Sequence, residues 1–170
     1  MIDSISKDIV YSLAAEIGPD AAYYRKESDR LYLSGIEIAT VIGTGVFISF
    51  CMGLVEGIKK GFHKQGEILG ENLVDSLVEK LRALLDEVRQ IDPQHPGVVK
   101  SKLENIHAQV DSTINQPNLL ASIISEAPAI HALEVKEIAF YLKESGFPED
   151  EVEQRAELLV VRIRREIDIL

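Results

Sequence analysis

Glu104 and His107 come closest, in residue type and spacing, to a metal-binding motif. A separation of three residues places both side chains on one face of a helix. Carboxylate di-iron bundles use two such Glu-x-x-His motifs with a glutamate from each of two further helices. A second copy is missing, since His131 and Glu134 occur in the reverse order. We therefore interpret Glu104 and His107 as a surface pair on an acidic helix and predict no metal site.

Cys51, the one cysteine, and the segment 43–48 are the other candidates for chemistry. Apolar neighbours such as Phe50 and Met52 are expected to raise the pKa of the thiol and leave it unreactive. The segment "GTGVFI" begins like a dinucleotide-binding loop, but Ile48 stands where the third glycine is required. Without a nucleophile–base pair or a nucleotide loop, the sequence predicts a protein that is not an enzyme and holds no cofactor.

Residues 135–159 are spaced like two helices joined by a short turn, as in a helix-turn-helix DNA reader. The second of these helices opens with acids, and the chain carries a formal net charge of −10. Nucleic-acid binding needs a basic surface, so we predict no nucleic-acid partner. Three arginines fit the negative end of the last helix dipole better than a phosphate site: Arg162, Arg164 and Arg165.

The elements that position these residues belong to a chain of 170 residues, 46% of them hydrophobic, which suffices for one domain or two small ones. Two prolines in "IDPQHPG", residues 91–97, mark the best candidate for a boundary between two parts of the chain. We predict an N-terminal helical part at 1–90, a linker at 91–97 and an acidic helical part at 98–170, or one continuous domain. The first twenty residues lack the features of a signal peptide, which favours a cytoplasmic protein or one placed on the membrane from that side.

Apolar residues at helical spacing predict an all-α, multi-helix bundle of six or seven helices. A short helix at 4–17 is expected to stop at "GPD", residues 18–20, and a short strand within 30–42 stays open because of its β-branched residues. Gly146 suits a helix C-terminus and Pro148 the start of the next helix. The amphipathic helices are expected at 73–88, 99–114, 119–127, 130–145 and 152–170.

One predicted helix, at about 36–62, differs from the others because it is strongly apolar. The stretch 38–55 has no formal charge, and about 20 apolar residues span a bilayer. Every fourth residue along one side of this helix is small, although glycine disfavours helices by up to about 1 kcal/mol. These residues, which we call the small-residue stripe, are Gly45, Ser49, Gly53, Gly57 and Gly61.

Such a stripe is typical of close helix–helix packing, so we predict that the small-residue stripe is a packing or oligomerisation surface. Three occupants are open: a helix of the same chain such as 73–88, the same helix of another copy, or first one and then the other. The remaining surface of the helix is apolar all round, which predicts burial in protein or in lipid. That apolar surface includes Phe47, Ile48, Phe50, Met52, Leu54 and Val55.

Two functions remain open from the sequence. In the first, the chain is a non-enzymatic homo-oligomer that associates with or inserts into membranes, as a pore-forming or effector protein. Its plan, with soluble helices around a hidden apolar element, is similar to pore-forming domains of the colicin type, as an analogy of architecture without a shared motif. In the second, the chain is a soluble cytoplasmic adaptor that binds another protein and uses the apolar helix as its core.

Overall fold

The computed structural model describes residues 5–25, 35–61, 71–91, 96–114 and 127–169, and these residues form six α-helices. All six contribute to one hydrophobic core. The predicted all-α bundle around an apolar central helix is therefore confirmed. The helices are α1 (Ile5–Arg25), α2 (Gly35–Gly61), α4 (Glu71–Arg89), α5 (Pro96–Ile114), α7 (Ala127–Glu144) and α8 (Val152–Ile169).

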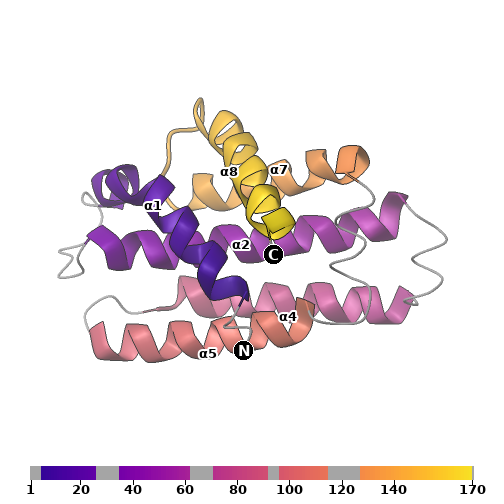
Figure 1. The fold of residues 1–170 in the computed structure, drawn as a ribbon, viewed down its shortest axis with the longest axis horizontal. Helices are drawn as coiled ribbons and strands as arrows, with labels where there is room; N and C mark the ends of the chain where they lie inside the picture. The colour runs from indigo at the N-terminus through magenta and orange to yellow at the C-terminus, as the bar shows by residue number, and fades with distance from the viewer. Residues whose placement is uncertain (1–4, 26–34, 62–70, 92–95, 115–126, 170) are drawn as a thin grey trace.

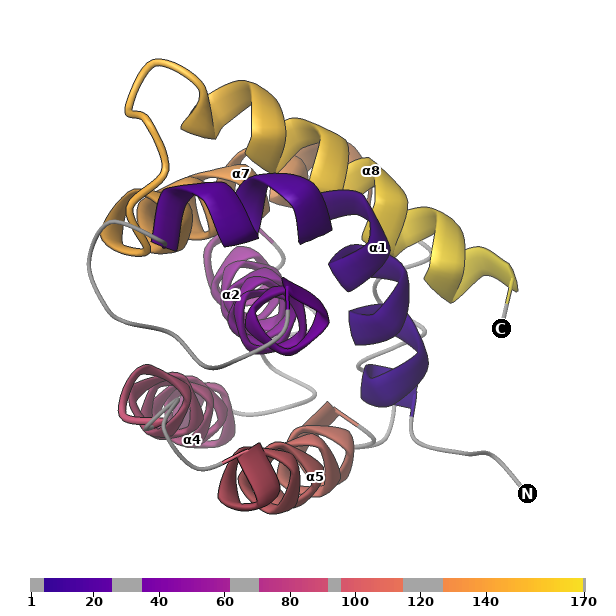
Figure 2. The same cartoon turned by 90° about the vertical axis from the view of Figure 1, so that its left-hand side faces the viewer.

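Helix α2 runs through the middle of the molecule (Figure 2). Helices α7 and α8 lie on one side of it, α4 and α5 on the opposite side, and α1 along a third side. The long axes of α2, α4 and α5 are roughly aligned, whereas α8 crosses over α7 (Figure 1). The predicted apolar helix at 36–62 is thus α2, and its neighbours shield it from solvent.

Helix α1 continues through "GPD" at 18–20, so the predicted stop there is wrong. A proline inside a helix removes one i→i−4 hydrogen bond and bends the helix without necessarily ending it. Figure 2 shows α1 changing direction along its length. The region 30–42 is helical from Gly35 onward, and its earlier residues lie outside the described part.

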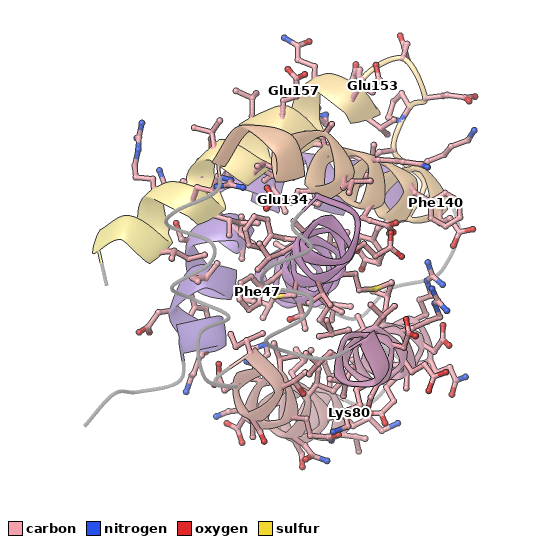
Figure 3. The ribbon with its side chains drawn as sticks, turned by 90° about the vertical axis from the view of Figure 1, so that its right-hand side faces the viewer. Phe47, Lys80, Glu134, Phe140, Glu153 and Glu157 are labelled. Carbon is pink, nitrogen blue, oxygen red and sulfur yellow. The ribbon has the colours of Figure 1, made fainter. Side chains whose placement is uncertain are left out.

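Helices α4 and α5 follow their predicted periodicity. The apolar face of α4 is buried at Leu77, Leu81 and Val88, while Lys80 points outward (Figure 3). Helix α5 begins at Pro96, inside the predicted linker. The predicted helix at 119–127 lies almost entirely outside the described residues.

Helices α7 and α8 form a hairpin joined by the turn at 145–151. Gly146 adopts a φ of 98°, a left-handed conformation that only glycine adopts at little steric cost, so its predicted role at a helix C-terminus is confirmed. Pro148 does not begin α8: its carbonyl accepts a hydrogen bond from the amide of Glu151 at 3.0 Å, and the helix begins at Val152. The prediction for Pro148 is therefore wrong by one turn.

Candidate functional site: the small-residue stripe of α2

Helix α7 of the same chain fills the small-residue stripe at two of its glycines. A Cβ atom built on Gly53 would lie 2.6 Å from Cα of Glu134 and 2.9 Å from the carbonyl oxygen of Leu133. A Cβ atom on Gly45 would lie 2.0 Å from the Tyr141 ring. Real Cβ atoms do not approach other atoms so closely, so both glycines permit a contact that no other residue allows without movement. The segment 73–88, one of the predicted occupants, does not lie at these two glycines.

The other stripe residues lie on the same helix. Ser49 is 1% exposed, and its Oγ has no hydrogen-bond partner among the described residues. Gly57 is buried, and Gly61 is the last residue of α2. A buried hydroxyl without a partner destabilises a fold by about 1–3 kcal/mol, so Ser49 is a weak point of this interface.

The predicted apolar surface of α2 lies in the core. None of its six side chains is more than 4% exposed, and the rings of Phe47 and Phe50 are nearly parallel, with centroids 6.4 Å apart. The side chain of Phe47 points from α2 into the interior of the molecule (Figure 3). The six buried residues are Phe47, Ile48, Phe50, Met52, Leu54 and Val55.

A buried ion pair joins α7 to α8 beside the small-residue stripe. The Arg164 guanidinium donates two hydrogen bonds to the Glu134 carboxylate, at 2.8 and 3.1 Å. The Glu134 side chain is 0% exposed, and that of Arg164 is 17% exposed. Burial raises the pKa of Glu134 to about 7, although Arg164 acts in the opposite direction. The prediction that Arg164 complements the helix dipole did not include this partner, which lies 30 residues away in sequence.

Glu104 and His107 do not form the predicted surface pair. Glu104 is exposed, whereas His107 is buried and its Nε2 lies 3.0 Å from Oγ1 of Thr44 on α2. The Thr44 hydroxyl donates its one proton to the Thr40 carbonyl, so Nε2 of His107 is the donor to Thr44. Burial also lowers the pKa of His107, which favours the neutral ring. His107 therefore ties α5 to α2.

The arrangement offers little for catalysis among the residues that the structure describes. Burial is the main cause that raises the pKa of the Cys51 thiol well above its usual range, which keeps it protonated. No group of three or more His, Cys, Asp or Glu side chains in the described segments could hold a metal ion. The segment 43–48 lies inside α2, whereas a dinucleotide loop joins a strand to a helix.

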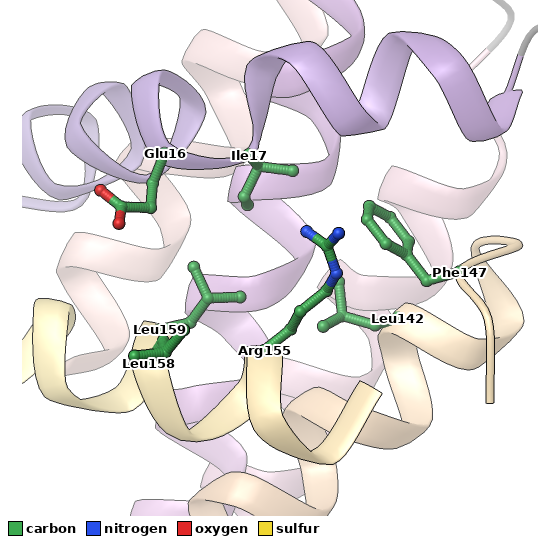
Figure 4. Close-up of a pocket in the computed structure, with 7 residues that line it drawn as sticks. All are labelled: Glu16, Ile17, Leu142, Phe147, Arg155, Leu158 and Leu159. Atoms are coloured by element: carbon green, nitrogen blue, oxygen red, sulfur yellow. The ribbon is translucent and has the colours of Figure 1, made fainter. Parts of the chain in front are cut away.

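A pocket of about 130 Å³ lies between α1 and the α7–α8 hairpin (Figure 4). Its walls are mostly apolar, and the Arg155 guanidinium lies 5.5 Å from the centroid of the Phe147 ring. Arg155 also donates two hydrogen bonds to the Glu151 carboxylate, one turn away on the chain. The lining residues are Glu16, Ile17, Leu142, Phe147, Arg155, Leu158 and Leu159.

Comparisons with known proteins add no family to this picture: no protein-family model matches the chain, and neither a curated protein nor a solved structure is significantly similar to it. The small-residue stripe and the helices packed on it therefore carry the functional argument.

Proposed function

We propose that the chain is a non-enzymatic helical protein that stores α2 inside the bundle and acts when α2 associates, through the small-residue stripe, with a second copy at a membrane. One observation carries the proposal. Ala39–Gly57 is long and apolar enough to cross a membrane, yet 89% of this segment is buried by the other helices. Residues 38–55 of this helix carry no formal charge, and Glu56 stands at the end of the apolar segment, so the stretch between can pass from a protein surrounding to a lipid surrounding without burying a charge in lipid.

The stripe gives this transfer a structural basis. Close contacts between small residues are a main source of helix–helix association in lipid, where the hydrophobic effect does not act between helices. Gly45 and Gly53 already permit such a contact with α7 inside the monomer. Loss of α7 would leave the same surface open to α2 of another copy.

Vesicle permeabilisation tests the proposal. Purified protein added to dye-loaded phosphatidylcholine vesicles should release the dye, and chemical cross-linking in their presence should trap oligomers. Met52 lies outside the small-residue stripe, and Met52→Leu keeps the side-chain volume. This control variant should release dye and form oligomers to the same extent as the wild type. A protein that stays a monomer and leaves both neutral and acidic vesicles intact would rule out the membrane function.

The second candidate is a soluble adaptor that binds another protein, with α2 as its permanent core. The core helix of a soluble protein can have the same length and composition as Ala39–Gly57. Two apolar side chains on α8, one turn apart, favour this candidate: Leu158 is 62% exposed and Val161 is 51% exposed. Leu158 also lines the pocket beside α1 (Figure 4). Intact vesicles and a monodisperse monomer are the outcomes expected of this second candidate.

A further inference from the structure

We infer that α7 and α8, with the turn between them, form a lid that detaches from α2 as one unit and exposes the small-residue stripe. The lid is residues 127–169. Its purpose, access of a second copy to the stripe, rests on the function proposed above, whereas its release is a property of the monomer. Helix α7 packs on α2 as extensively as any pair of helices in the described residues, so release depends on polar costs at this interface and on weak contacts at the other edges of the lid.

Contacts within the lid are strong. The Glu134–Arg164 pair links α7 to α8 by two hydrogen bonds, and Phe147 in the connecting turn packs under Arg155 of α8. Helix α8 packs chiefly on α7 and has only a small interface with α1. The two helices are therefore expected to move together.

Two costs exist only while the lid is docked. The first is Ser49, on the side of α2 that packs on α7, whose buried Oγ has no hydrogen-bond partner in the part of the chain that the structure describes. The second is the added burial of the Glu134–Arg164 pair, because docking packs the Glu134 backbone against Gly53 while its carboxylate is 0% exposed. Because the pair lies within the lid, release would hydrate it without breaking it. Desolvation of buried ions offsets much of their attraction, so release relieves this penalty.

The remaining edges of the lid are held loosely. The pocket of about 130 Å³ lies where the lid meets α1 (Figure 4). Helix α4 reaches α7 through Arg89 and Glu144, 2.8 Å apart, with side chains 36% and 46% exposed. Ser12 of α1 bonds to Arg162 and Glu166 of α8 at 2.9 and 3.1 Å. Water can replace such part-exposed bonds at little cost.

On the opposite side of α2, the polar groups at the contact with α5 have partners, although this contact is less extensive than the one with α7. Thr44 and His107 satisfy each other across the α2–α5 contact. Cys51 follows Thr44 by seven residues, about two helical turns, and therefore lies on the same α5 side of α2. A thiol at position 49 would face the lid, whereas Cys51 lies about 200° around the helix axis from it, so the two positions report different openings.

Thiol labelling of the full chain separates these openings. One protein is the wild type, labelled at Cys51, and the other is Ser49→Cys combined with Cys51→Ala. If the lid is released, the labelling rate of the thiol in Ser49→Cys should exceed that of Cys51 by at least about tenfold. Each rate is first corrected for the pKa of that thiol in the unfolded chain. Urea should accelerate labelling at position 49 less steeply, because release exposes less surface than global unfolding.

The inference is overturned if both thiols react at the same corrected rate with the same urea dependence, since both would then report global unfolding. Ile138→Cys combined with Cys51→Ala provides a second reporter, on the buried face of α7, should the change at Ser49 disturb folding. These measurements contain no lipid. Lid release in a protein that stays monomeric and leaves vesicles intact would remove the proposed function alone, whereas leakage without selective labelling would remove the lid alone.

Discussion

At the scale of single residues, Gly53 sets how closely α2 and α7 approach. Because a Cβ at this position would meet the backbone of Glu134 at 2.6 Å, Gly53→Ala forces the helices apart. We expect the free energy of unfolding to fall by about 1–3 kcal/mol, more than the gain in helix propensity can offset. Chemical denaturation followed by circular dichroism measures this change.

Gly97 supplies the matched control for Gly53. It is exposed on α5, and a Cβ there would have no atom within 4 Å. Gly97→Ala should therefore be neutral or stabilising by up to about 1 kcal/mol. Equal effects of the two substitutions would show that the contact between α2 and α7 is not close-packed in solution.

Glu134 should make stability depend on pH in an unusual direction. Its pKa is raised in the folded protein to about 7 from an ordinary value of 4.5, so the folded state holds this proton more tightly than the unfolded state. Stability relative to Glu134→Gln should therefore fall as pH rises from about 4.5 to about 7, and level off above that range. The charged group facing it on α8 is Arg164, and the Cys51 thiol on α2 stays protonated.

Paired denaturation curves of wild type and Glu134→Gln at several pH values test this direction. Only the difference between the two proteins is informative, because it cancels the other titrating groups. Between about pH 4.5 and pH 7, the stability of the wild type relative to Glu134→Gln should change by roughly 1–3 kcal/mol. A wild type that gains stability over Glu134→Gln as pH rises would mean that the attraction of Arg164 outweighs desolvation.

Some of these residues were visible in the sequence and others were not. Gly53 was identified because a four-residue spacing of small side chains is a local pattern. The predictions for Arg164 and His107 are wrong or incomplete, and no role is predicted for Glu134, since each looks like a surface residue until a helix from elsewhere in the chain covers it. Burial of a charged side chain depends on long-range packing, and no spacing within one helix reports it.

At the scale of the elements, the ion pair should couple α7 to α8. With Glu134→Gln or Arg164→Gln alone, the remaining charge stays buried or mostly buried without its partner, which costs about 3–5 kcal/mol for a fully buried ion. With both changes together no such charge remains. The double variant should therefore lose clearly less stability than the sum of the single variants at pH 8, measured by a double-mutant cycle.

The pair between Arg89 and Glu144 is the control for that cycle. It also joins two helices at 2.8 Å, but both side chains are more than a third exposed. Its coupling should be no more than about 1 kcal/mol. Similar coupling in the two cycles would indicate that the Glu134–Arg164 pair is hydrated in solution.

The helices themselves were largely predictable because burial of one face imposes a 3.6-residue period. This period located α4, α5 and α8 to within a few residues. It fails at the end of α1, where "GPD" predicts a stop although the helix continues to Arg25. A proline removes one i→i−4 backbone hydrogen bond, but the packing of the flanking turns decides whether the helix bends or ends there.

At the scale of the whole molecule, the partner of the small-residue stripe could not be predicted. The spacing of small residues predicts that another helix packs closely on α2, but it does not indicate which of several helices does so. In the monomer that helix is α7, whose contact residue Glu134 lies 81 positions along the chain from Gly53. Whether the stripe also serves a second copy depends on the free energy that holds the α7–α8 lid in place.

Charge over the whole molecule gives the proposed membrane function a direct test. With a formal net charge of −10, the chain is repelled by anionic lipid surfaces at low ionic strength. Dye release from phosphatidylcholine vesicles should therefore exceed release from vesicles rich in phosphatidylserine at about 20 mM salt, and the gap should narrow near about 500 mM, where the Debye length is only a few ångströms.

Insertion of the uncharged stretch 38–55 of α2 should itself respond little to salt, so release from neutral vesicles serves as the internal control. Its rate should change less between the two salt concentrations than the rate for anionic vesicles. Faster release from anionic vesicles at low salt would instead point to a cationic contact with headgroups. That result would contradict an approach to the membrane dominated by net charge, and hydrophobic transfer of α2 would no longer account for the activity.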